Sequence, residues 1–114
     1  MAKIIKLSDN LQKKDVFKLT HTSTVPLASL VEEDQSIRVV SWVVLETVND
    51  DGETGARIIL QDDNGTCYGT GSRVFINQFM ELAETFEGES VPEFKPVKRR
   101  ATKTGRTFIA IEVL

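Results

Sequence analysis

Residues 72–86, with the sequence SRVFINQFMELAETF, carry the strongest helical signal in the chain. Their large apolar side chains recur at the i, i+4, i+7 and i+11 spacing of one helix face: Phe75, Phe79, Leu82 and Phe86. Ser72 is a favourable N-cap, and Gly88 follows where such a helix ends. The sequence therefore predicts an amphipathic helix over residues 73–86, and the fold class depends on what flanks it.

Extended segments flank this helix on both sides. Residues 37–48 (IRVVSWVVLETV) are β-branched and aromatic without a helical period, and they exceed the usual strand length of about 5–6 residues. This length predicts a bent strand that is shared between two parts of a sheet. Turn signals at Gly52, Gly65 and Gly105 separate the remaining strands. The five predicted strands cover residues 37–48, 56–61, 66–70, 93–101 and 107–113.

Three antiparallel strands, one helix and two antiparallel strands follow one another in this prediction. That order is typical of the OB-fold, a five-stranded Greek-key barrel with its helix between strands 3 and 4. We therefore expect an all-β domain with one helix over residues 35–114. Residues 1–34 are expected to form an N-terminal arm packed on that domain. Ser8-Asp9-Asn10 offers a cap for a short helix in the arm, but the apolar spacing after it is poor.

Composition narrows the classes of function. No apolar run approaches the roughly 18 residues of a membrane span, and the first residues lack a signal-peptide core. The single cysteine, Cys67, has no internal disulfide partner, which agrees with a reducing cytoplasm. Neither Cys67 nor the single histidine, His21, has a ligand set or catalytic partner nearby, and the Asp-rich turns lack EF-hand spacing. We expect no metal, no cofactor and no enzymatic activity.

The formal net charge of −3 conceals a strong segregation of charge along the chain. Residues 1–31 carry five Lys and two Asp, a balance of +3. Residues 32–93 carry fourteen Asp or Glu and three Arg, a balance of −11. Residues 94–114 carry six Lys or Arg and one Glu, a balance of +5. An acidic protein with one basic segment is compatible with a localised track for a polyanion.

The basic segment coincides with the predicted hairpin at residues 97–111. No acidic residue occurs from Lys95 to Arg106. The cations around the turn are Lys98, Arg99, Arg100, Lys103 and Arg106. Such cations would neutralise phosphates and make binding salt-dependent. The alternative is a solvated hairpin whose charges protect a sheet edge. The acidic surroundings favour the first interpretation.

Aromatic side chains could add base stacking to the phosphate contacts. Because Ile109, Ile111 and Val113 alternate along the last strand, Phe108 is expected on its other face. Tyr68 is a second candidate by the same alternation. For Trp42, burial in the core and stacking remain equally open. Phe94, beside Lys95, is a further candidate, whereas the phenylalanines of the helix belong to its core stripe.

Two motifs resemble a known family. Tyr68-Gly69-Thr70-Gly71-Ser72-Arg73-Val74-Phe75-Ile76 and Lys103-Thr104-Gly105-Arg106-Thr107-Phe108-Ile109 resemble segments of the small single-stranded DNA-binding proteins of bacteriophages and related mobile elements. The resemblance covers residues 37–114. It implies an OB-fold that coats single-stranded DNA, with Lys103 and Arg106 on phosphates and Phe108 on bases. Gly69 and Gly71 replace larger residues of that pattern, and the flexible acidic tail of the housekeeping relatives is not expected here.

These observations predict sequence-independent binding of single-stranded DNA in phage DNA replication or recombination. The expected binding residues are Lys98, Arg99, Arg100, Lys103, Arg106, Phe108, Tyr68 and Trp42. The location would be the host cell cytoplasm, and the expected partners are DNA, replication or recombination proteins and further copies of the chain, with no membrane. Two alternatives stay open: an OB-fold adaptor that binds proteins through its acidic face, and an RNA binder.

Overall fold

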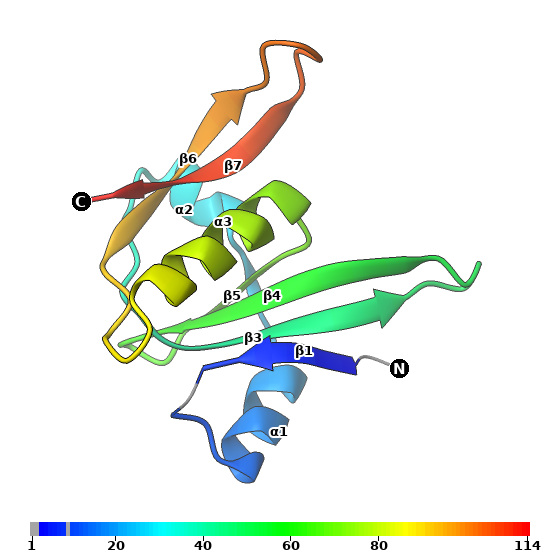
Figure 1. The fold of residues 1–114 in the computed structure, drawn as a ribbon, viewed down its shortest axis with the longest axis vertical. Coiled ribbons are helices and arrows are strands. Elements are labelled where there is room, and N and C mark those ends of the chain that lie inside the picture. Colours follow the sequence, from blue (N-terminus) through cyan, green and yellow to red (C-terminus); the bar gives the residue numbers. More distant parts are fainter. Residues whose placement is uncertain (1–2, 9) are drawn as a thin grey trace.

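The computed structural model describes residues 3–8 and 10–114 and is built mostly from strands, with 40% of the chain in strands and 25% in helices. The elements follow in the order β1 (Lys3–Leu7), α1 (Lys13–His21), β2 (Val25–Pro26), α2 (Ala28–Glu32), β3 (Val39–Val48), β4 (Thr54–Asp62), β5 (Cys67–Thr70), α3 (Arg73–Thr85), β6 (Phe94–Arg100) and β7 (Thr107–Val113). Figure 1 shows two β-hairpins, β3–β4 and β6–β7, that extend in different directions from the packed centre.

The strands form two sheets that do not close into a barrel. One has five strands in the order β1-β3-β4-β5-β2, and the other is the β6–β7 hairpin. Within the described residues, one isolated bridge joins them, in which the Ile37 N–H donates to the Phe94 carbonyl at 2.8 Å and the Phe94 N–H donates back at 3.2 Å. The prediction of a five-stranded barrel is therefore corrected: the barrel does not close, because β6 and β7 diverge from the large sheet beyond this bridge (Figure 1).

The long first strand of the predicted domain is confirmed. β3 pairs with β4 along its length and with β1 on its other side. A register shift between Val39 and Ser41 interrupts the pairing with β4, as a β-bulge does where a strand bends. Ile37, just before the bulge, is the residue that bridges to β6. β3 thus belongs to the large sheet, and the second sheet is reached by Ile37, which lies two residues before the strand begins.

The predicted helix is present as α3. Its N-cap is Ser72, whose Oγ accepts a hydrogen bond from the Phe75 N–H at 3.3 Å. The helix lies between the large sheet and the β6–β7 hairpin (Figure 1). Gln78 also binds the hairpin, because its Oε1 accepts the Ile111 N–H at 2.9 Å. This contact covers part of the edge of β7 that β6 leaves unpaired.

The expectation of a single helix is wrong, because α1 and α2 also form. Both are short, and α1 buries only one residue, Leu19, so neither produces a clear apolar period. Neither Ser8 nor Asn10 is the N-cap of α1: that position is Gln12, whose N–H donates to the Asp15 carboxylate at 3.1 Å. Asp9, like residues 1 and 2, lies outside the described residues. The segment expected as an arm supplies both edge strands of the large sheet, β1 and β2.

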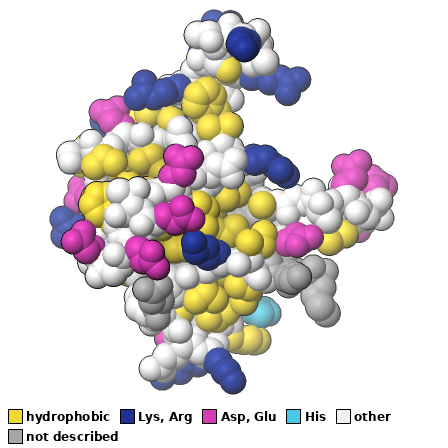
Figure 2. Space-filling view, viewed as in Figure 1, with side chains coloured by type: hydrophobic (Ala, Val, Ile, Leu, Met, Phe, Trp, Pro, Cys, Tyr) yellow, Lys and Arg dark blue, Asp and Glu magenta, His cyan; other side chains and the backbone are white. Residues whose placement is uncertain are grey.

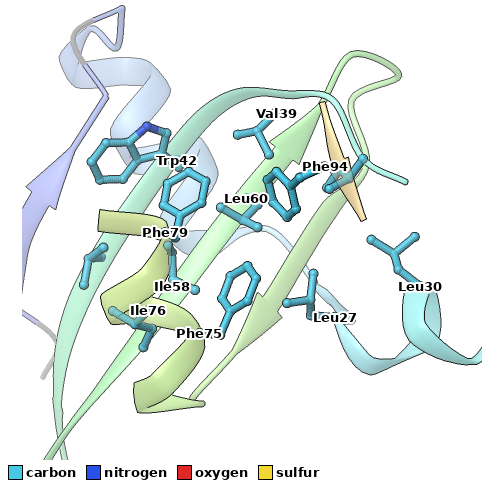
Figure 3. Packing of buried hydrophobic residues seen from close by; sticks show 12 residues of the cluster. Leu27, Leu30, Val39, Trp42, Ile58, Leu60, Phe75, Ile76, Phe79 and Phe94 are labelled. Carbon is cyan, nitrogen blue, oxygen red and sulfur yellow. The ribbon is translucent and has the colours of Figure 1, made fainter. Parts of the chain in front are cut away.

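Apolar clusters cover both faces of the large sheet. The larger one joins that sheet to α3, α2 and β6, and its rings lie close together in Figure 3. Phe79 meets Trp42 edge-on at 5.3 Å between ring centroids, and it lies 6.1 Å from Phe94 and 6.3 Å from Phe75. The smaller cluster, on the opposite face, packs Leu19 of α1 against the sheet. Phe79 is thus a residue of α3 that contacts rings of both sheets.

Replacing Phe79 by Ala should destabilise the fold by about 3–5 kcal/mol, because it empties a fully buried ring site between two sheets. Urea unfolding monitored by the fluorescence of Trp42, the single tryptophan, would measure the loss. Phe17→Ala is the matched control, since Phe17 is 64% exposed and should cost about 0.5 kcal/mol or less. Equal costs for the two variants would contradict the assigned core.

Candidate nucleic-acid interface

The β6–β7 hairpin carries its cations on both of its faces. Cross-strand partners share a face, and the register pairs Arg99 with Phe108, Lys98 with Ile109 and Arg100 with Thr107. Phe94, Ile109 and Ile111 pack against the larger core cluster, so Lys98 and Arg100 lie on the inward-facing side of the hairpin, towards its free end. Arg99 and Phe108 lie on the opposite, outer side, where Ala110, nearer the base of the hairpin, is buried.

The turn of the hairpin is fixed by hydrogen bonds. The Ala101 N–H donates to the Arg106 carbonyl and the Gly105 N–H donates to the Ala101 carbonyl, both at 2.9 Å. Gly105 has φ of +69°, a left-handed conformation that glycine adopts without strain. The Arg100 Nε also donates to the Gly105 carbonyl at 3.1 Å. One predicted binding cation, Arg100, therefore also helps to shape the turn.

Ion pairs attach the base of the hairpin to the rest of the molecule. Lys95 Nζ lies 2.6 Å from Asp34 Oδ1, and this hydrogen bond raises the pKa of Lys95. Glu93 accepts hydrogen bonds from Ser36 at 2.6 Å and from Arg38 at 3.0 Å, which together lower the pKa of the Glu93 carboxyl. Lys95 is thus neutralised locally, which separates it from the cations nearer the turn.

All five predicted phosphate-binding cations are exposed. Arg99 forms an ion pair with Glu112 at 3.8 Å, a long separation for two exposed groups, so the pair restrains Arg99 only weakly. Within the described residues, no carboxylate lies within 4.0 Å of the other four: Lys98, Arg100, Lys103 and Arg106. Figure 2 shows Lys and Arg side chains gathered over the hairpin and Asp and Glu at the end of the β3–β4 arm.

The aromatic candidates separate into different environments. Phe108 is half-buried on the outer face of the hairpin, beside Arg99. Trp42 is 6% exposed and packs against Phe79, so it belongs to the core and offers no free ring face. Phe94 is fully buried. Of the two interpretations left open for Trp42, the structure supports core burial.

Tyr68 does not join the hairpin site. It lies opposite Leu60 in the large sheet, on the same face as Trp42, and packs on the larger core cluster. Burial raises the pKa of its phenol, and the negative charges of Asp62 and Glu33 raise it further. An anionic surrounding is unfavourable for a phosphate backbone. Of the eight predicted residues, the structure thus brings together the five cations and Phe108 on the hairpin.

Sequence reasoning missed an open cleft on another part of the surface. It has a volume of about 1240 Å³ and lies between the end of β1, the start of β3 and the segment after α3. Three of its glutamates, Glu84, Glu87 and Glu89, are exposed, and Lys6 pairs with Glu84 at 3.6 Å. The clustering of Glu in residues 84–93 was visible in the sequence, but the cleft depends on the placement of β1.

No family model, curated protein or solved structure matches the chain. Among residues 3–8 and 10–114, no group of three or more His, Cys, Asp and Glu side chains is placed to hold a metal ion. In the same described part, no helix has the length and apolar character needed to cross a membrane. A function is therefore inferred from the side chains of the hairpin itself.

Glu93→Gln should lower the melting temperature at pH 7. Because folding lowers the pKa of Glu93, its charged form stabilises the fold above the usual Glu range, and this contribution is lost as the pH falls through the lowered pKa. The difference from the unmodified chain should therefore shrink below about pH 4. Thermal unfolding at pH 7 and below about pH 4 measures this difference in melting temperature. Glu89→Gln is the control in the same segment. A difference that is equal at both pH values would contradict the assigned role of the carboxylate.

Proposed function

We propose that this protein binds single-stranded DNA through the β6–β7 hairpin, without reading base sequence. The observation that carries the proposal is the direct cross-strand pairing of Arg99 with Phe108 on the outer face of the hairpin. A cation and a partly exposed ring side by side suit one nucleotide, whose phosphate takes the charge and whose base takes the ring face. Neither contact reads the edge of a base, so no sequence preference is expected.

The remaining cations extend this contact along a backbone. Lys98 and Arg100 lie on the other side of the same two strands, and Lys103 and Arg106 lie at and beside the turn. A strand that passes around the free end of the hairpin would therefore meet positive charge throughout. Acidic groups concentrate elsewhere, including the end of the β3–β4 arm (Figure 2), which favours one orientation of a polyanion.

We further propose that the domain is an opened OB-fold. The order β3-β4-β5-α3-β6-β7 is the chain order of that fold, and the Ile37–Phe94 bridge lies where its first and fourth strands would pair. Such domains bind about 4–16 nucleotides each. With the resemblance to phage single-strand binders, this supports a role in phage DNA replication or recombination in the host cell, alongside other copies of the chain or replication proteins.

The double variant Arg99→Glu/Arg106→Glu should weaken binding of a fluorescently labelled oligo-dT at least tenfold at low salt. Each lost phosphate contact should also reduce the slope of log affinity against log salt by about 0.7. Fluorescence anisotropy of the labelled oligomer measures both quantities. Quenching of Trp42 is not the appropriate signal, because its ring is buried. Lys13→Glu/Arg73→Glu, which changes two exposed cations of α1 and α3 outside the hairpin, is the control with the same change in net charge, and it should retain most of the affinity.

Three results would contradict the proposal in different ways. Absence of binding by the unmodified chain at low salt would remove nucleic-acid binding altogether. Equal losses in the hairpin and control variants would indicate a general charge effect with no localised site. Stronger competition by an RNA oligomer of equal length than by DNA would make the protein an RNA binder.

A second candidate function is an adaptor that binds a basic protein segment through the glutamates of the open cleft. The observation that favours it is the exposure of Glu87 and Glu89 beside the half-buried Phe86 on the cleft wall. The affinity of such an adaptor for its protein partner would not change in the Arg99→Glu/Arg106→Glu variant, whereas the affinity for DNA would fall. The hairpin variants therefore separate the two candidates.

A further inference from the structure

Arg57 occupies an unusual position on the face of the large sheet that is turned away from α3. Neighbouring residues of β4 point to opposite faces: Ile58 and Leu60 join the larger core cluster, and Ile59 joins the smaller one beneath α1. Arg57 therefore lies on the α1 side, next to the smaller cluster. It is half-buried there, and β4 carries no other cation.

Two neighbours hold the guanidinium of Arg57 in place. Its Nη2 donates a hydrogen bond to Thr24 Oγ1 at 2.8 Å, on the segment between α1 and β2. The same nitrogen lies so close to β5 that a Cβ added to Gly69 would overlap it. The missing side chain at Gly69 therefore lets the guanidinium lie against the backbone of β5.

The guanidinium so held has no anionic partner. Within the described residues, no carboxylate lies within 4.0 Å of Arg57, and Thr24 is the acceptor that its side chain reaches. A guanidinium carries five N–H donors, so most remain available. In the described part of the chain no buried side-chain nitrogen or oxygen lacks a hydrogen-bond partner, so the unused donors are open to solvent. A fixed, partly desolvated fork of donors is suited to bidentate binding of a phosphate.

We propose that Arg57, positioned by Thr24 and Gly69, binds a phosphate of the same single strand at a second site separate from the hairpin. This inference rests on the proposed function. The helix that precedes Thr24 in the chain also carries exposed cations and a ring, which suit a polyanion. Along one face of α1, at i, i+3, i+4 and i+7, these are Lys14, Phe17, Lys18 and His21. The Phe17 ring is stacked on His21 at 4.1 Å.

Arg57→Gln should reduce the slope of log affinity against log salt for oligo-dT by about 0.7, the loss of one phosphate contact on a single strand. Arg38→Gln is the matched control, because the guanidinium of Arg38 is already paired with Glu93 at 3.0 Å and its slope should not change. Gly69→Ala should also weaken binding, although net charge is preserved, because the new methyl group displaces the guanidinium.

A purely structural role for Arg57 would change the melting temperature and leave the salt slope of the folded variants unchanged, and that result overturns the inference. If Arg57→Gln does not fold by circular dichroism, Arg57→Lys and Thr24→Val decide in its place. Arg57→Lys keeps the charge but loses the fork, and Thr24→Val loses the anchoring hydroxyl. Both should weaken binding, and unchanged affinity in both overturns the inference. Absence of DNA binding by the unmodified chain removes this inference and the hairpin proposal together, whereas a normal slope in Arg57→Gln removes this one alone.

Discussion

Packing of aromatic rings around α3 is the interaction on which the arrangement of this molecule depends. Phe79 contacts Trp42 of the large sheet and Phe94 of the second sheet, while Phe75 lies 6.1 Å from Phe94. Among residues 3–8 and 10–114, the main-chain hydrogen bonding between the sheets is one isolated bridge at Ile37. Side-chain burial, and not a continuous hydrogen-bonded barrel, therefore sets the direction in which the β6–β7 hairpin leaves the core. The hairpin can project its charged half into solvent because its apolar half is anchored in this way.

Burial and function compete for the same aromatic side chains. A ring that ties α3 to a sheet has no free face for a base, which is the position of Trp42. Phe108 is less constrained, because it lies on the face of β7 opposite Ile109 and Ile111 and is half-buried, although Ala110 of the same face is buried. The cations of the hairpin also differ between its base and its turn. Lys95 is paired with Asp34 at the base, whereas the cations nearer the turn are exposed. The proposed site therefore begins where the core ends.

Strong local patterns in the sequence predicted the elements from residue 37 onward. The stripe of Phe75 and Phe79 defined α3, and the alternation around Phe108 placed that ring correctly on the hairpin. Barrel closure was not predictable, because it depends on long-range strand pairing that no local period encodes. The prediction for the first 34 residues was incomplete for a related reason. α1 and the edge strands form through contacts with the large sheet and bury little apolar surface on their own. The setting of Arg57 required knowing that Gly69 and Thr24 meet it across three segments.

Amide chemical-shift mapping of the isotope-labelled full chain during titration with oligo-dT tests the central claim most directly. If the hairpin binds the strand, the largest shifts should fall within residues 98–108, with smaller ones near Arg57 and Thr24. The segment from Glu84 to Glu93 should change little, because its glutamates repel the backbone. Shifts concentrated around the open cleft, with the hairpin unchanged, would contradict the claim that this hairpin is the DNA-binding element.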